Sequence, residues 1–190
     1  MKKGRLEAFS DGVLAIIITI MVLELHVPEE HTLKALLAEM PLFISYTLSF
    51  MYVGIFWNNH HHLFMITEKV NGKILWYNLL LLFFISFIPF VTAWLDFNNL
   101  ESISVALYGI VITLASFAFY LLKMEILKIH SEESLVRKSV SGNTKEFIGF
   151  ALFILGIALS FVQPYIGISA YLIVALSWFI PEKRIENIIK

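Results

Sequence analysis

The chain has 190 residues, of which 58% are hydrophobic and 15% are charged; its formal net charge is −1 and its mean hydropathy is +0.79. Soluble domains carry about a quarter charged residues and interrupt their apolar residues every few positions. Here the apolar residues form blocks long enough to cross a bilayer, so the composition indicates an all-α membrane protein. The absence of cysteine excludes disulfides, thiol chemistry and cysteine-ligated iron–sulfur sites. No basic, aromatic-rich patch indicates a nucleic-acid partner.

Six apolar blocks predict six transmembrane helices. They are Phe9–Leu25, Pro41–Phe56 with an extension toward Phe64, Ile74–Leu95, Ile103–Leu122, Phe147–Val162 and Tyr165–Ile180. Residues 1–190 therefore form a single membrane domain without room for a separate soluble one. We expect the polar stretch Lys123–Lys145 to extend the fourth helix and then turn at Ser141–Asn143. Asn143 and Glu146 have the spacing of a capping pair for the fifth helix.

The loops predict the orientation of the chain, because basic residues concentrate on the cytosolic side of membrane proteins. One set of loops and ends carries Lys2, Lys3, Arg5, Lys69, Lys73, Lys123, Lys128, Arg137, Lys138, Lys145, Lys183, Arg184 and Lys190. The other set carries one basic residue, Lys34, with Glu24, Glu29, Glu30, Glu39, Asp96 and Glu101. Both termini are therefore predicted to be cytosolic.

Two local features refine this topology. Pro89 lies inside the third block, where a proline removes a backbone donor and kinks a helix. Apolar residues recur at helical spacing within Leu33–Met40, which predicts a short interfacial helix in the loop after the first span.

The first block has an unusually polar beginning, formed by Arg5, Glu7, Ser10 and Asp11. One interpretation is that Arg5 reaches lipid headgroups and Asp11 caps or pairs locally. An inward-facing, hydrogen-bonded site is favoured, because an aspartate that faces lipid is costly.

The end of the second block offers partners for this polar beginning. It reads Trp57, Asn58, Asn59, His60, His61 and His62. Neighbouring helical positions point about 100° apart, so three consecutive histidines cannot share one metal ion, and no metal site is predicted. We expect these residues to bond Ser10 and Asp11 or to face the cytosol, and nothing singles out a proton-sensing role.

Farther along the first block, Ile16, Thr19, Ile20 and Leu23 share one helical face. Such a stripe is common in packed helices, so periodicity alone does not identify a pore. The chain contains no glycine-rich phosphate loop, hydrolase elbow or zinc-protease motif, and it is not expected to be an enzyme. The carbonyl filter sequence of ordinary potassium channels is also absent.

Arg5, Phe9, Ser10 and Asp11 spell the R-x-x-x-F-S-D signature at the start of the first block, and Trp57–His62 follows a Trp-x-x-His-His pattern. In these motifs and in its six-helix size the chain resembles the transmembrane protein 175 family of endosomal and lysosomal potassium channels. A single six-helix unit is similar to the prokaryotic members, whereas the animal members carry two units.

The resemblance implies a potassium-permeable cation channel in the cell membrane, without a cofactor, built from four copies of this chain around a central pore. It implies that the pore is narrowest at Ile16, Ile20 and Leu23, and that Thr19 contributes to a modest selectivity for potassium over sodium. It also implies a structural motif that ties the first helix to its neighbours, formed by Arg5, Phe9, Ser10 and Asp11. The alternative is a proton-coupled secondary transporter that uses Asp11 and the histidines at 60–62. A membrane enzyme centred on these histidines is the least favoured.

Overall fold

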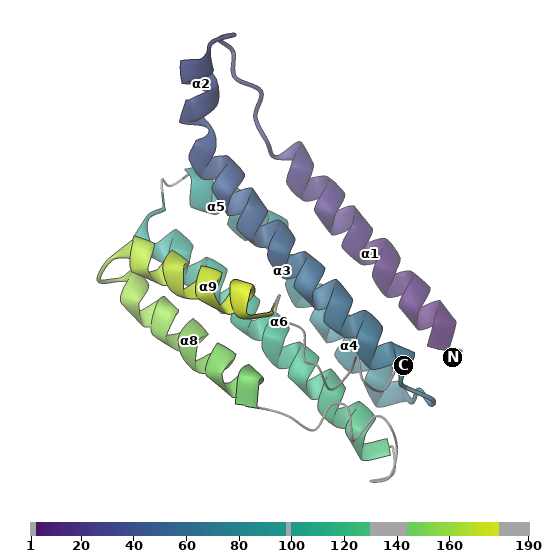
Figure 1. Ribbon diagram of the computed structural model, residues 1–190. Coiled ribbons are helices and arrows are strands. Elements are labelled where there is room, and N and C mark those ends of the chain that lie inside the picture. The colour runs from purple at the N-terminus through teal and green to yellow at the C-terminus, as the bar shows by residue number, and fades with distance from the viewer. Residues whose placement is uncertain (1–2, 98–99, 130–143, 179–190) are drawn as a thin grey trace.

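The computed structural model describes residues 3–97, 100–129 and 144–178, and within these ranges every regular element is a helix (Figure 1). The helices are α1 (Lys3–Leu23), α2 (Leu33–Ala38), α3 (Met40–Met65), α4 (Gly72–Ile85), α5 (Ile88–Phe97), α6 (Ser102–Ile129), α8 (Thr144–Ser160) and α9 (Pro164–Trp178). The helical fold class predicted from the sequence is confirmed for the described residues.

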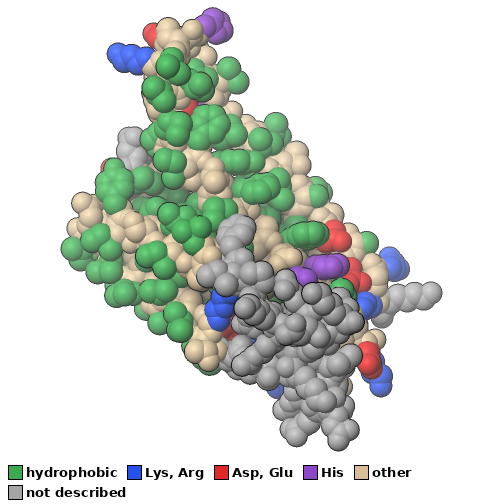
Figure 2. Space-filling view, viewed as in Figure 1, with side chains coloured by type: hydrophobic (Ala, Val, Ile, Leu, Met, Phe, Trp, Pro, Cys, Tyr) green, Lys and Arg blue, Asp and Glu red, His purple; other side chains and the backbone are tan. Residues whose placement is uncertain are grey.

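Within the described ranges, four stretches are long and apolar enough to cross a membrane: α1, α3, Gly72–Asp96 (which joins α4 and α5) and α6. The helices α8 and α9, with 17 and 15 residues, are shorter. Hydrophobic side chains cover the middle of the visible face of the bundle, and charged side chains lie toward its ends (Figure 2). This distribution is typical of a protein that spans a bilayer, where charged groups are costly at the centre.

The break predicted at Pro89 is present. The third predicted helix is divided into α4, which ends at Ile85, and α5, which begins at Ile88. Proline has no backbone N–H, so a continuous helix would leave the carbonyl of Ile85 without its usual donor. The chain instead tightens, and the N–H of Phe87 donates to the carbonyl of Phe84 at 3.2 Å.

Other predicted boundaries differ by a few residues: the first predicted helix, Phe9–Leu25, is α1 and begins earlier, at Lys3, and the fifth, Phe147–Val162, is α8 and begins at Thr144. The second predicted helix extends past Phe64, because α3 ends at Met65, and the fourth continues beyond Leu122 to Ile129. The helix predicted within Leu33–Met40 is α2, and its first turn is capped by the Thr32 hydroxyl, which accepts a bond of 3.1 Å from the N–H of Ala35.

Some predictions lie outside the described residues. These are the turn at Ser141–Asn143, the capping role of Asn143, the last two residues of the sixth predicted helix (179–180), and the basic residues Lys2, Arg137, Lys138, Lys183, Arg184 and Lys190. The proposed capping partner, Glu146, is described, and its carboxylate forms a 2.7 Å ion pair with Lys123.

The helix α1 lies at one edge of the bundle, α8 and α9 lie at the opposite edge, and α3 runs between them (Figure 1). On its inner side α1 packs against α3, α4 and α5. Buried hydroxyl groups connect the interior: Ser49 lies 2.7 Å from Thr92 and 3.1 Å from the Tyr108 hydroxyl, and Tyr52 donates to the carbonyl of Tyr171 at 2.6 Å. Gly156 leaves room for the Tyr171 ring, since a Cβ there would lie 2.6 Å from a ring carbon.

Six helix ends that the loop charges assign to the same side lie together at one end of the bundle. They are the beginnings of α1, α4 and α8 and the ends of α3, α6 and α9. The contacts between them are Lys3 Nζ to the Phe64 carbonyl (2.8 Å), Asn71 Nδ2 to Glu125 Oε1 (3.2 Å), Lys123 to Glu146 (2.7 Å), and Lys145 Nζ over the Trp178 ring (4.9 Å). These contacts hold the described ends of α1, α3, α4, α6, α8 and α9 together.

Candidate functional site

The helix α1 buries one stripe and exposes the rest of its surface. The buried positions are Leu6, Ser10, Leu14, Ile17 and Met21. Steps of three and four residues keep them on one face, which packs against the body of the bundle. Because α1 contacts the rest of the described chain along a single stripe, most of its apolar surface is left exposed.

The stripe that the resemblance assigns to a pore lies on the open side of α1. Ile16 is 61% exposed, Ile20 and Leu23 are also exposed, and Thr19 is exposed with its hydroxyl donating to the Ala15 carbonyl at 2.9 Å. Ile17, next to Ile16 and of the same residue type, is only 3% exposed. Neighbouring isoleucines thus face opposite environments. An exposed apolar stripe of this kind suits contact with lipid, with another subunit or with a pore.

At the other end of α1, three buried side chains form a hydrogen-bonded chain across three helices. The Asn78 amide, on α4, donates to the Ser10 hydroxyl at 2.9 Å, and its oxygen lies 2.8 Å from Nε2 of His60, on α3. The amide oxygen only accepts, so His60 carries its proton on Nε2. The Ser10 hydroxyl in turn donates to the carbonyl of Leu6 at 2.9 Å. We call Ser10, Asn78 and His60 the polar anchor of α1.

Asn78 was missed by the sequence analysis. Its signal is a lone amide within the apolar block Ile74–Leu95, and a polar side chain in such a block marks a packing or functional site. Ser10 is buried, as the inward-facing interpretation of the motif predicts.

Asp11 differs from that interpretation. Its carboxylate accepts a 3.0 Å bond from the Trp57 indole N–H, but both side chains are exposed on the single chain. The partner lies at the end of the second predicted helix, as expected. It is the tryptophan, and not a histidine, an asparagine or Arg5, because the face of α3 that carries Trp57 lies alongside Asp11 while His60 is turned toward Asn78.

The remaining polar residues of α3 do not join the anchor. Asn58 and His61 are exposed, and Asn59 donates to the carbonyl of Ile55 at 2.8 Å. His61 stacks on Trp57 with ring centres 6.0 Å apart, and Nδ1 of His62 is buried without a hydrogen-bond partner in the described part of the chain. The three histidines therefore occupy three different environments.

Arg5 and Phe9 lie on the open side of α1, although the resemblance makes them part of the motif that ties this helix to its neighbours. Phe9 is 53% exposed, and Arg5 makes no hydrogen bond or ion pair within residues 3–97, 100–129 and 144–178. Together with Leu75, Asn78 and Leu79 of α4, they border an open groove of about 310 Å³. Among the described residues, Arg5 thus ties α1 to no other helix by a hydrogen bond or an ion pair.

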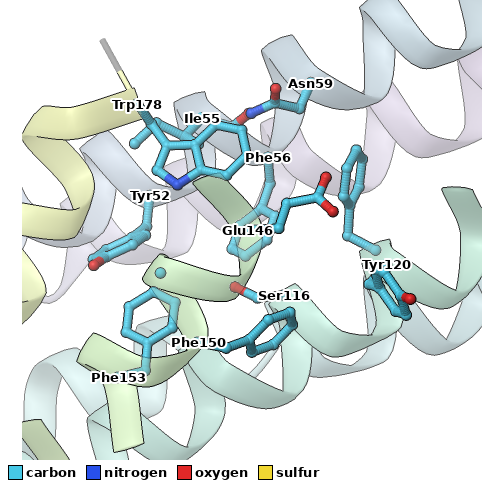
Figure 3. A pocket seen from close by; sticks show the side chains of 12 residues that line it. Tyr52, Ile55, Phe56, Asn59, Ser116, Tyr120, Glu146, Phe150, Phe153 and Trp178 are labelled. Carbon is cyan, nitrogen blue, oxygen red and sulfur yellow. The ribbon is translucent and has the colours of Figure 1, made fainter. Parts of the chain in front are cut away.

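A second hollow, of about 40 Å³, lies among α3, α6, α8 and α9, away from α1 (Figure 3). Its walls are mainly aromatic and include Tyr52, Tyr120, Phe150, Phe153 and Trp178. Two of its polar groups have partners elsewhere: one Glu146 oxygen pairs with Lys123, and the Asn59 amide bonds the backbone. With few polar groups that converge on it, this hollow is best described as space between packed rings.

The family described as "Endosomal/lysosomal potassium channel TMEM175" matches residues 5–89. A protein of Chryseobacterium sp. (strain P1-3), named as a potassium channel, is 50% identical over 190 residues, which cover 100% of this chain and 99% of the relative. The human endosomal/lysosomal proton channel TMEM175 is 37% identical over 101 residues, covering 47% of this chain and 20% of the relative. The crystal structure of a lysosomal potassium-selective channel TMEM175 homolog from Chamaesiphon minutus matches with a TM-score of 0.81 and 28% identity, covering 93% of this chain and 95% of that one.

The apolar bundle and a match over the whole chain define a membrane protein of an ion-channel class. The chain belongs to the TMEM175 family, among its prokaryotic members. The resemblance inferred from the motif of the first helix is thereby confirmed.

Proposed function

We propose that this protein is a potassium-permeable cation channel of the cell membrane, assembled as a homotetramer with α1 around a central pore. The observation that carries the proposal is the exposed stripe Ile16, Thr19, Ile20 and Leu23 on a helix that packs against its own chain along one side only. The bacterial relatives named as potassium channels support potassium as the permeant ion. Such a channel performs no catalysis and needs no cofactor.

The proposed topology has six spans and two cytosolic termini. α8 and α9 would cross together with the four longer spans, since they form a hairpin packed on α6. The contacts that gather six helix ends, among them Lys3 with α3 and Lys123 with Glu146, then belong to the cytosolic side. The excess of lysine and arginine in the loops at this end supports that orientation.

A tetramer is the economical way to build the pore. A bundle of this size fills its own interior with side chains, as the buried apolar cluster around α3 and α6 illustrates. A water-filled path therefore requires several copies. The exposed side of α1 is available to face its symmetry mates, and the lipid bilayer would cover the remaining apolar surface.

The chemistry of the stripe predicts a modest selectivity. Ile16, Ile20 and Leu23 offer no oxygen atom that could replace the hydration shell of an ion. A narrow apolar ring favours dewetting and disfavours ions that hold water tightly, such as sodium. Thr19 adds one hydroxyl per chain, whose proton is bonded to its own helix and whose oxygen remains an acceptor.

The rival function is a proton-coupled transporter that uses Asp11 and the histidines. It needs a chain of titratable groups, but Asp11 bonds Trp57, and His60 bonds Asn78. Neither contact links the carboxylate to an imidazole, so the channel is the better supported function.

Recording from the purified protein in a planar bilayer tests the proposal. Unitary current steps with potassium on both sides are expected for a channel. Flux that depends on a proton gradient, without unitary steps, would establish the transporter instead. Native mass spectrometry in mild detergent provides the second readout, and only monomers and dimers would contradict the tetramer.

A further inference from the structure

We infer that Arg5 faces the cytosolic mouth of the pore, where its four copies form a ring of positive charge that slows the access of cations from the cytosol. This inference rests on the proposed function, because it requires that α1 line a pore. It gives Arg5 a role distinct from that of Ser10 and Asp11 in the same motif.

The register of α1 places Arg5 on the face of the exposed stripe. Arg5 lies eleven positions before Ile16. At about 100° per residue, eleven positions make three full turns plus roughly 20°, so the two side chains point in nearly the same direction. They are separated by about 16 Å along the helix axis. Phe9, which is exposed and lies four positions after Arg5, continues the same face, while Leu6 and Ser10 point into the bundle. A helix that presents Ile16 to an axis therefore presents Arg5 to the same axis near its cytosolic end.

The charge of Arg5 is not cancelled within the described chain. The nearest acids along the helix, Glu7 and Asp11, lie about 200° and 240° around it from Arg5, and Asp11 accepts the Trp57 bond. Lys3, the other described cation at this end of α1, is turned to the carbonyls that end α3. Among the described residues of α1, the unpaired positive charge on the open face is therefore that of Arg5.

Four guanidinium groups around a narrow path repel potassium as it arrives from the cytosol. The range of this repulsion is set by salt, since the Debye length is about 10 Å at 0.1 M and about 3 Å at 1 M. The unitary current carried by potassium that leaves the cytosol should therefore be reduced at low salt, and the reduction should vanish at high salt.

The groove between α1 and α4 offers a different use for Arg5. Leu75 and Leu79 line it beside the guanidinium, so an anionic lipid could place its phosphate on Arg5 and a chain on the leucines. The alignment of Arg5 with the exposed stripe favours the pore mouth, and the lipid becomes an outcome of the test.

The chain has no cysteine, so Arg5→Cys carries the sole thiol of the protein. Methanethiosulfonate reagents of positive and of negative charge are applied from the cytosolic side in about 0.1 M KCl. We expect the positive reagent to lower the outward unitary current and the negative reagent to raise it, each by roughly twofold, with both effects lost in 1 M KCl. The parent chain, which has no thiol for the reagents to modify, is the negative control. Lys128→Cys is the matched control, because Lys128 is an exposed cation at the same end of the bundle on α6.

Equal unitary currents after the two reagents would overturn the inference. Arg5 would be assigned to the lipid groove by two results together: the two reagents change the current of Arg5→Cys equally, and the current of Arg5→Gln, unlike that of the parent chain, does not respond to anionic lipid. If Arg5→Cys fails to assemble, Arg5→Lys and Arg5→Gln replace it: the lysine variant should keep the low-salt reduction, and loss of the reduction in both would overturn the ring. Absence of unitary current from the parent chain would instead count against the proposed function.

Discussion

The two halves of α1 are held by different physical means. The half that contains Ser10 and Asp11 is fixed by directional hydrogen bonds to α3 and α4. The half that contains Ile16 and Leu23 is held by apolar packing of one stripe and exposes the opposite face. Hydrogen bonds fix the rotation of a helix, whereas apolar packing tolerates small shifts. The polar half thus sets which face of the apolar half is open.

The largest effect is expected from removing the centre of the polar anchor. Asn78→Leu leaves the Nε2 proton of His60 without its buried acceptor and the Ser10 hydroxyl oxygen without its buried donor, although that hydroxyl still donates to the Leu6 carbonyl. Each buried group that loses its partner costs about 1–3 kcal/mol, so the variant should lose about 2–6 kcal/mol and assemble poorly. The melting temperature and elution profile in detergent measure this loss.

Asn58→Leu is the control for that change, since Asn58 is an exposed amide on α3. It should leave the elution profile unchanged. A stable Asn78→Leu protein would mean that packing alone sets the rotation of α1, and the contrast between its two halves would then be lost.

The next prediction uses the neighbouring isoleucines in the apolar half. Ile16→Asn would bring four amides to the proposed constriction, so water should remain there at lower cost, potassium conductance should rise and sodium should pass more easily. Ile17→Asn should instead bury an amide without a partner and cost about 1–3 kcal/mol without raising the current. Unitary conductance and reversal potential separate the two variants. A channel opened by Ile17→Asn and not by Ile16→Asn would shift the pore register by one residue.

Asp11→Ala is expected to have a smaller effect than the sequence alone suggests. Treated as one partner of a buried ion pair, Asp11 would be worth about 3–5 kcal/mol. The carboxylate and Trp57 are exposed on the single chain, so one charge-assisted bond should contribute about 1–2 kcal/mol. A double-mutant cycle of Asp11→Ala and Trp57→Phe measures their coupling in the melting of the assembled protein. A coupling near 4 kcal/mol would show that assembly buries the pair.

The sequence predicts this molecule well where one chain decides the outcome. The apolar blocks located every described span, and Pro89 located the break between α4 and α5, because bilayer thickness and backbone donors act locally. The polar partners were harder to predict. Which side chain of the Trp57–His62 run meets Asp11 depends on the rotation of α3 against α1, and Asn78 enters the anchor from a helix that carries no motif. The use of the exposed face depends on contacts between chains, which periodicity does not encode.

The smallest expected effect tests whether the hydroxyl on the exposed stripe matters. Thr19→Val keeps the shape of the side chain and removes the oxygen, whose proton is bonded to the Ala15 carbonyl. If isoleucine and leucine rings set the selectivity, the ratio of potassium to sodium permeability should change by less than about twofold, which corresponds to about 0.4 kcal/mol. Thr47→Val on α3 is the matched control, because its hydroxyl makes the same local bond, at 2.7 Å to the Phe43 carbonyl, away from α1. Reversal potentials under bi-ionic conditions measure the ratio. A tenfold loss of selectivity in Thr19→Val, but not in Thr47→Val, would identify the four Thr19 hydroxyl oxygens as the selectivity filter. Discrimination between ions in the apolar half of α1 would then depend on a polar site and not on the isoleucine and leucine rings.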